Sequence, residues 1–227
     1  RSILLYAYGG SRMSEIKLYA DSGGGTVSLK APATTTSNAA VPFVLPVADG
    51  SAGQLLKTDG SKNLSFTTVS SGLTEADMWR ITADFQGDAD PVTSNWERID
   101  RAGEGHLGTG LTQSSGVFSF PSTGWWQIIF QGNFHYSSDN RYGSVTIQTT
   151  VDDGTWLTIA SSSDGFYDHS SSSHSYSSAT CMTLFDVTST SNCKARFSIG
   201  QEDNSAYTDG SSDVTYTGVS FIRLGDT

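Results

Sequence analysis

The sequence is divided into short segments in which apolar and polar residues alternate, and turn-forming residues interrupt these segments repeatedly. Clear examples are residues 78–85, 125–134 and 144–151. Alternation with a period of two is typical of β-strands that bury one face. No amphipathic segment is long enough for a substantial helix. For residues 73–227 the pattern predicts an all-β head domain, an antiparallel jelly-roll sandwich of about 8–10 strands.

Two turns predict β-hairpins directly. Asp152-Asp153-Gly154 separates the strand-like residues 144–151 from residues 155–160. Thr58-Asp59-Gly60 lies inside residues 54–66, which alternate in the same way. An Asp-Gly pair between alternating segments favours the tight turn that joins two antiparallel strands.

Two cysteines, Cys181 and Cys193, raise the question of a disulfide. Residues 179–187 and 193–200 both alternate like strands and are joined by turn-forming residues 188–192, so we predict a hairpin. In that hairpin Cys181 lies about 20 Å from Cys193, whereas a disulfide requires Cα atoms within roughly 7 Å. The sequence therefore predicts two free thiols that pack as small core residues, which fits assembly in a reducing cytoplasm.

Residues 13–72 differ in composition from the rest of the chain. Breakers such as Gly23-Gly24-Gly25 separate strand-like segments that contain few large apolar side chains. Such segments cannot bury enough surface to fold alone, so they are either disordered or ordered by contact with other subunits. We favour an extended arm of short strands that serves attachment or trimerisation, because its apolar residues recur regularly. The expected partner contacts are Leu45, Leu55, Leu56, Leu64 and Phe66.

Residues 1–12 precede Met13-Ser14-Glu15, which is typical of a natural start. Gly9-Gly10-Ser11-Arg12 is what a translated ribosome-binding site would encode, so we expect residues 1–12 to be a leader or a non-native extension. The alternative is that Ile3-Leu4-Leu5-Tyr6 forms a short apolar arm that docks on a partner.

The charge balance limits the classes of partner. The chain has 13 Lys and Arg residues against 23 Asp and Glu residues, a formal net charge of −10. Nucleic acids and anionic membranes bind dense cationic surfaces, so we expect neither as a partner. No segment approaches the roughly 20 apolar residues of a membrane span, and residues 3–8 are too short for a signal peptide. These features predict a soluble protein that is not secreted.

Residues 111–130 resemble a motif from the globular heads of the complement and tumour-necrosis-factor superfamily. The motif has an aromatic residue, six residues, Phe, five residues and then Gly-x-Tyr-x-Phe-x-aromatic. Its upstream Asn or Asp falls on His106, so the match is partial. Its other positions are occupied in register by Leu111, Phe118, Gly124, Trp126, Ile128 and Phe130. The resemblance implies a jelly-roll head in which alternate residues of one central strand face the core.

Other segments resemble structural proteins of tailed phages, notably marine and cyanobacterial ones. They include residues 53–60 and 63–66 of the arm and residues 79–82 and 94–98 of the head. This resemblance implies a homotrimer on the virion surface that binds other virion proteins and is assembled in the host cytoplasm. It implies a capsid decoration, cement or fibre-head module anchored by the arm. The alternative is a tail-fibre or receptor-binding tip that recognises a host surface glycan.

The sequence contains no pattern typical of an active site. No Ser lies in a Gly-x-Ser-x-Gly nucleophile elbow, and Asp152-Asp153 occupies a tight turn rather than a cleft. His169 and His174 lie in a Ser-rich stretch, where a solvated loop is more expected than a zinc site. Loop carboxylates at residues 84–90, 139–140 or 203–204 suit calcium better, although the twelve-residue calcium-loop signature is absent. We therefore predict no enzyme, no cofactor and no metal site.

Aromatic residues beside hydrogen-bonding groups are the strongest candidates for ligand binding. Aromatic faces pack on sugar C–H groups, and polar neighbours orient the hydroxyls. The candidate glycan-facing residues are Tyr136, Asp139, Arg141, Tyr142, Phe166, Tyr167 and His169. The alternative is that these residues cap strands or lie at a subunit interface.

Outward apolar residues are expected to contact a second subunit. Trp125 and Trp126 are consecutive, so a strand turns them to opposite faces. With Trp126 in the core, Trp125 points outward as a subunit contact. Phe134, Tyr136 and Phe221 are expected to face outward as well, and together these residues predict a homotrimer.

Overall fold

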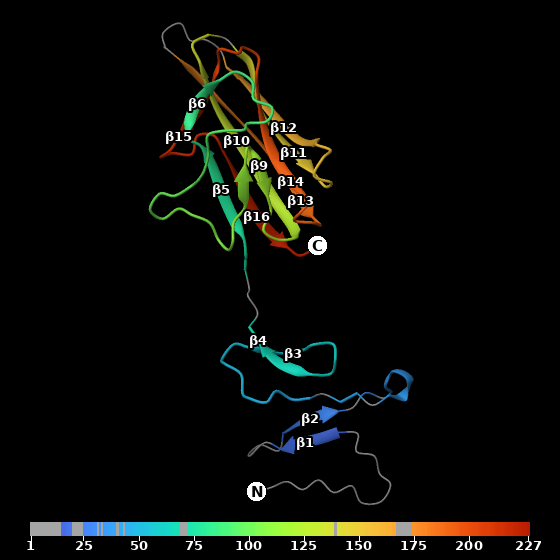
Figure 1. Ribbon diagram of the computed structural model, residues 1–227. Helices are drawn as coiled ribbons and strands as arrows, with labels where there is room; N and C mark the ends of the chain where they lie inside the picture. Colours follow the sequence, from blue (N-terminus) through green and yellow to red (C-terminus); the bar gives the residue numbers. More distant parts are fainter. Residues whose placement is uncertain are drawn as a thin grey trace, which may run out of the picture. The chain divides into compact units, whose positions relative to one another are not determined.

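The computed structural model describes residues 15–19, 25–30, 32, 34–39, 41–42, 44–68, 72–138, 140–166 and 174–227. The expected extension at residues 1–12 and the candidate residues Asp139, Tyr167 and His169 lie outside the described residues. The chain divides into two compact units, Arg1–Val69 and Ser70–Thr227, whose strands are labelled in Figure 1. Within the described ranges, no helix combines the length and the apolarity needed to cross a membrane.

Unit 1 contains two small antiparallel strand pairs. In the first pair, β1 (Glu15–Tyr19) is hydrogen-bonded to β2 (Thr26–Lys30). In the second pair, β3 (Leu55–Thr58) is hydrogen-bonded to β4 (Leu64–Thr67). A 3-10 turn, η1 (Thr36–Asn38), separates the pairs along the chain. The described part of unit 1 therefore has the short strands expected of the arm.

The side chain of Asp59 closes the β3–β4 hairpin. Its carboxylate accepts hydrogen bonds from Asn63 Nδ2 at 2.7 Å, from Ser61 N at 2.7 Å and from Asn63 N at 3.1 Å. The bond from the Asn63 side chain, followed by the bond from Ser61, holds the pKa of Asp59 below its ordinary value. Gly60 has φ of 78°, which a residue without Cβ adopts without strain. The hairpin predicted within residues 54–66 is confirmed.

Unit 2 is an antiparallel sandwich of two sheets (Figure 1). One sheet has the order β6-β15-β10-β16-β5-β7, with β13 on the other edge of β10, and the second has the order β12-β11-β14-β9-β8. The predicted all-β antiparallel jelly roll is confirmed, and so is the β11–β12 hairpin around Asp152-Asp153-Gly154. The strands are β5 (Ala76–Ile81), β6 (Ala83–Gln86), β7 (Trp96–Arg98), β8 (Thr112–Ser114), β9 (Val117–Ser119), β10 (Gly124–Tyr136), β11 (Asn140–Thr150), β12 (Leu157–Phe166), β13 (Ser175–Val187), β14 (Lys194–Gln201), β15 (Tyr207–Ser211) and β16 (Gly218–Gly225).

The described part of unit 2 has twelve strands, β5 to β16, which exceeds the number predicted. Residues 78–85 were predicted to form one strand, but the strand breaks at Thr82. The Thr82 N–H donates to the carbonyl of Asn95 at 2.9 Å, outside the sheet ladders. β5 and β6 then occupy separate positions in the same sheet. β7, β8 and β9 have three residues each, too few for alternation to identify a strand.

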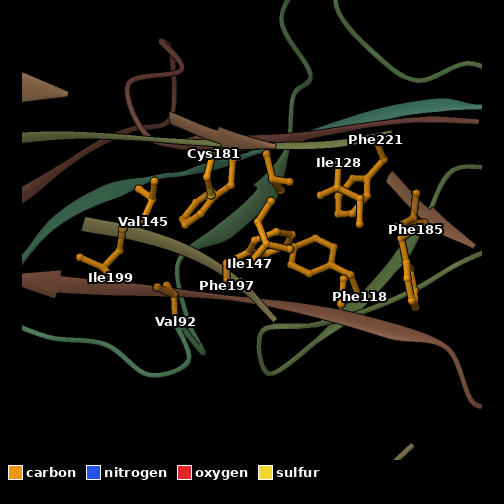
Figure 2. Close-up of a cluster of buried hydrophobic side chains, with 14 of the residues drawn as sticks. Val92, Phe118, Ile128, Val145, Ile147, Cys181, Phe185, Phe197, Ile199 and Phe221 are labelled. Carbon is orange, nitrogen blue, oxygen red and sulfur yellow. The ribbon is translucent and has the colours of Figure 1, made fainter. Parts of the chain in front are cut away.

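The two sheets enclose a core rich in aromatic rings (Figure 2). Phe118 is fully buried. Its ring centroid lies 5.2 Å from Trp96, 5.3 Å from Phe197, 5.4 Å from Phe221 and 5.5 Å from Trp79. Three of these pairs meet edge to face, an arrangement that ring quadrupoles favour. The core therefore depends on interlocking rings contributed by both sheets.

The residues of the recognised motif occupy core positions. Trp126, Ile128 and Phe130 are fully buried on β10. Gly124 begins this strand with φ of 132°, and a Cβ added there would lie 2.3 Å from the carbonyl oxygen of Gly225. Only glycine fits this close approach between β10 and β16.

The predicted outward orientation of Phe134 and Phe221 is wrong, because both side chains are fully buried. Phe134 lies eight positions after Trp126 on the same strand, and an even spacing places both on one face. Phe221 is paired with Ile128 and shares its inward face. Tyr136 is half-buried and packs against the margin of the core.

Cys181 and Cys193 are free and buried, which confirms the predicted thiols. The predicted hairpin between them is wrong, because β13 pairs with β10 whereas β14 pairs with β11 and β9. The intervening turn crosses from one sheet to the other, and local alternation does not distinguish such a crossing from a hairpin. Burial raises the pKa of the Cys181 thiol to about 11, so it stays protonated at neutral pH.

Phe118→Ala is expected to reduce the free energy of unfolding by about 3–5 kcal/mol, because it leaves a cavity among four other rings. Urea unfolding of the intact protein, followed by tryptophan fluorescence, measures the loss. Val151→Ala, at an exposed turn position, is the control and should change stability by less than about 0.5 kcal/mol. A loss below about 1 kcal/mol for Phe118→Ala would contradict the central role of this ring.

Candidate functional site

The outward face of the seven-stranded sheet carries large apolar side chains. On β10 and β13, alternate residues face the core, so the residues between them face away from it. Ile129 is paired with Met182, and Gln127 lies between Leu184 and Ile222 on its two sides. Met182 and Leu184 are 62% and 57% exposed. The apolar face, as we define it, consists of Trp125, Ile129, Met182, Leu184 and Ile222.

The two tryptophans of β10 point to opposite faces, as predicted. Trp126 is fully buried and Trp125 is 43% exposed. Asp186 lies opposite Trp125 on β13, and its Oδ1 is buried without a hydrogen-bond partner in the described part of the chain. Met182 and Leu184 were not predicted as contacts. The apolar residues on both faces of residues 181–185 could have indicated an outward apolar surface on this strand.

The arm residues predicted as partner contacts expose apolar surface within unit 1. Leu45, Leu55 and Leu56 are each more than half exposed, and Phe66 is partly exposed. Leu56 and Phe66 are paired across β3 and β4, whereas Leu64 is half-buried. An open cleft of about 440 Å³, the arm cleft, is lined by Leu45, Pro46, Val47, Ala48, Asp49, Leu56 and Phe66.

The opposite end of β10 carries aromatic rings on the same outward face. His135 stacks on Tyr207 of β15, with ring centroids 4.8 Å apart and an interplanar angle of 4°. On its other side, the His135 ring lies 5.8 Å from that of Tyr176 on β13. Tyr176 is largely exposed. We call His135, Tyr176 and Tyr207 the aromatic strip.

Open clefts adjoin the aromatic strip. The two clefts described next each combine an aromatic ring with hydroxyl, amide or carboxylate groups, a composition suited to a polar ligand with C–H faces. The first cleft, about 370 Å³, is lined by Asn133, Asp164, Tyr176, Ser177, Ser178 and Asp209. The second, about 420 Å³, is lined by Gln86, Tyr136, Ser137, His174, Ser205 and Tyr207.

Two of the predicted glycan-facing residues meet at the turn formed by Glu202 and Asp203. The Tyr136 hydroxyl donates to Asp203 Oδ2 at 2.8 Å, and this bond raises the pKa of Tyr136. The Arg141 side chain pairs with Glu202, and its backbone N–H donates to Glu202 Oε2 at 2.5 Å. The Arg141 N–H is the main cause of a lowered pKa at Glu202.

Of the other predicted residues, Tyr142 joins this turn through its backbone, since its carbonyl accepts a hydrogen bond from Glu202 N at 3.1 Å. Tyr142 is exposed on β11 and is absent from the described lining of either cleft. The backbone of Phe166 is paired with that of Asn140 at the end of β12. Tyr176, Tyr207 and Asp209 were missed because they reach β10 only through the pairing of strands distant in sequence.

The most deeply buried charges belong to the fold rather than to a site. Arg80 is fully buried and donates to Glu97, Asp100 and Glu104 at distances from 2.6 to 3.3 Å. Because these partners lie on β7 and the residues after it, the cluster fastens β5 to that segment. These carboxylates compensate the buried guanidinium charge, so the cluster serves the fold.

One group of metal-ligating side chains occurs among the described residues, at Asp84, His135 and Asp209. Its members lie on β6, β10 and β15, at the aromatic strip. Spacing along the chain could not reveal it, because strand pairing assembles it from three distant segments.

No protein-family model matches the chain, and no curated protein matches it. Solved structures do resemble it. A crystal structure of murine APRIL at pH 5.0 is 12% identical, covers 66% of this chain and 98% of its own, and has a TM-score of 0.48. The structure of Eiger TNF from S. frugiperda is 12% identical, covers 69% of this chain and 96% of its own, and has a TM-score of 0.50. At that identity the likeness to Eiger TNF shows the fold alone, a TNF-like all-β jelly roll.

Proposed function

We propose that this chain is a homotrimeric structural protein of a tailed-phage virion surface. Residues 73–227 form the head, a capsid decoration, cement or fibre-head module, and residues 13–72 attach it to another virion protein. The protein is assembled in the host cytoplasm, and no enzymatic step is part of the proposal. The observation that carries the proposal is the apolar face on β10, β13 and β16.

The apolar face is suited to contact with further copies of the chain. Covering a large apolar side chain contributes about 1.5–3 kcal/mol, and Met182 and Leu184 are more than half exposed. A donor from a neighbouring copy would also satisfy the buried Oδ1 of Asp186, whose desolvation is otherwise uncompensated. Contacts that repeat around an axis close into a cyclic oligomer, and the resemblance of residues 111–130 to trimeric heads supports three copies.

The arm supports attachment to a different virion protein. Within the described residues of unit 1, the apolar side chains of Leu45, Val47, Leu56 and Phe66 at the arm cleft remain exposed. The resemblance of residues 53–60 and 63–66 to phage structural proteins favours a virion partner. The net charge of −10 favours solubility of the assembled surface and disfavours nonspecific adsorption.

A second function, recognition of a host surface glycan by a tail-fibre tip, is favoured by the aromatic strip. Tyr176 exposes a ring that can pack on a sugar face. Asn133, Asp164 and Asp209 line the same cleft and can accept or donate hydrogen bonds to hydroxyls. The second function therefore places a candidate glycan contact at this cleft, beside the residues predicted from the sequence.

Met182→Glu combined with Leu184→Glu is expected to convert a trimer into monomers. Each copy must then bury two charges in the contact. This raises the protein concentration at which half of the chains are assembled by roughly 100-fold or more. Sedimentation velocity measures the change, and an unaltered melting curve in dilute solution shows that the head remains folded. The matched control, Leu157→Glu with Ile159→Glu, places the same charges on exposed positions of the other sheet. A monomeric wild type, or a trimeric variant, contradicts the proposal.

Removal of residues 13–72 is expected to abolish attachment to virions without unfolding the head. Mass spectrometry of purified particles measures how much of the chain is retained, and the melting curve of the free protein reports folding. Leu56→Glu in the full-length chain should act in the same direction, because it charges the arm cleft. Ser61→Glu, in the exposed hairpin turn, is the control. Full retention of the truncated chain on particles would exclude the arm as the anchor.

Tyr176→Ala is expected to weaken glycan binding by roughly tenfold, because it removes both the area that the ring buries on the sugar and the further contribution of about 0.5–1.5 kcal/mol from aromatic stacking. A glycan array probed with the intact protein identifies the ligand, and titration with that ligand measures the loss. Tyr142 belongs to the site predicted from the sequence and does not line the cleft. Tyr142→Ala should therefore leave binding unchanged when the glycan occupies the cleft. An array without any bound glycan argues against the second function and leaves the structural role intact.

A further inference from the structure

Three ligand-bearing side chains converge at the aromatic strip. Asp84, Asp209 and His135 lie on β6, β15 and β10, which are neighbours in that order in the seven-stranded sheet. Each offers one ligand atom, and these atoms all lie within 4.8 Å of one another. The adjacent residues Phe134 and Thr208 are fully buried, so His135 and Asp209 share the outward face.

A backbone irregularity brings β6 and β15 close enough for this arrangement. The register between them shifts between Thr208 and Ser211, so that an additional residue of β15 lies opposite β6. Gly210 occupies the irregular segment, and a Cβ added there would lie 2.5–2.6 Å from the backbone of Ala83. The absence of a side chain at Gly210 therefore permits the approach of Asp84 to Asp209.

The side chains are held in place by contacts outside the cluster. The stacked ring of Tyr207 fixes the plane of His135 from outside the cluster, whereas the contact between His135 Nδ1 and Asp209 Oδ1 lies within it. Asp84 Oδ1 accepts a hydrogen bond from Gly210 N at 2.8 Å. Such supporting contacts are typical of metal ligands, because they reduce the ordering required when an ion binds.

Electrostatics favour a cation between the two carboxylates. The side chains of His135 and Asp209 are only 14% and 15% exposed, so water screens them weakly. Asp84 adds a second carboxylate within 4.8 Å of the other ligand atoms, and this carboxylate repels that of Asp209. The contact between His135 and Asp209 does not by itself require Asp84 to be there. A divalent ion neutralises both carboxylates at once.

We infer that Asp84, His135 and Asp209 form a binding site for a divalent transition-metal ion, with Zn²⁺ as the best-matched common ion. An imidazole ligand favours Zn²⁺ and its neighbours over Ca²⁺ and Mg²⁺, which prefer sites made of oxygen atoms. Metal–ligand bonds of about 2.0–2.2 Å span ligand separations up to roughly 4.4 Å. A small rotation of the exposed Asp84 side chain closes the remaining gap.

The site links the edge of the sheet to its centre. An ion held by Asp84, His135 and Asp209 cross-links the four-residue strand β6 to β10 through β15. Its remaining coordination positions are open to water or to a ligand in the 370 Å³ cleft, because Asp209 also lines that cleft. The inference does not depend on the proposed structural role or on glycan binding.

The test is calorimetric titration of the intact, chelator-treated protein with ZnCl₂, and with CaCl₂ in parallel. We expect one Zn²⁺ per chain, little heat from Ca²⁺, and a melting temperature raised by roughly 5 °C at 100-fold excess over Kd. Asp84→Asn and His135→Gln should each weaken Zn²⁺ binding by at least about tenfold. Asp84 is exposed, so its variant is expected to fold. Asp213→Asn makes the same charge change on the loop after β15 and should bind like the wild type.

The ¹⁵N resonances of the imidazoles give a residue-specific readout. Zn²⁺ should shift the His135 Nδ1 resonance in the wild type, and this shift should be lost in Asp84→Asn. Absence of Zn²⁺ binding up to millimolar concentration would overturn the inference and leave His135 and Asp209 as a hydrogen-bonded pair. Binding that survives both Asp84→Asn and His135→Gln would place the ion elsewhere and would overturn it as well.

Discussion

The pairing of β10 with strands on both of its edges is the constraint on which the rest of unit 2 depends. β13 runs along one edge over the full length of β10, while β16 and then β15 occupy the other. Once this register is set, Trp126, Ile128 and Phe130 must enter the core. The residues between them must then face outward, and they supply both candidate surfaces. A shift by one residue would exchange these two sets completely.

The outward face of this strand is chemically divided. Near Gly124 it is apolar and suits protein contact, whereas near Tyr136 it carries rings, carboxylates and an imidazole. The same strand therefore positions both surfaces, but they can change independently because Trp125 and His135 lie ten positions apart along it. This separation is consistent with a protein that assembles through one region and binds a ligand or an ion through the other.

Local alternation predicted the features that depend on neighbouring residues. The inward face of β10, the outward Trp125 and the hairpins at Asp59 and Asp152 all follow from periodicity and turn chemistry. The features it missed depend on which strands become partners. The break at Thr82 depends on Asn95, the crossing between β13 and β14 depends on the second sheet, and Asp84 meets Asp209 only through β6 and β15. The burial of Arg80 likewise requires carboxylates on β7 and after it.

The position of β16 constrains how a newly made chain reaches this structure. Gly218–Gly225 is synthesised after all the other strands, yet it pairs with β10 and β5 in the interior of the sheet. Until this segment leaves the ribosome, Phe118, Phe120 and Phe197 lack the ring of Phe221 that packs against them. The sheet is therefore completed only after this segment has emerged, and folding is slowed because its pairings join distant segments. A polypeptide that terminates before β16 lacks the strand that lies between β10 and β5, so it cannot complete this sheet.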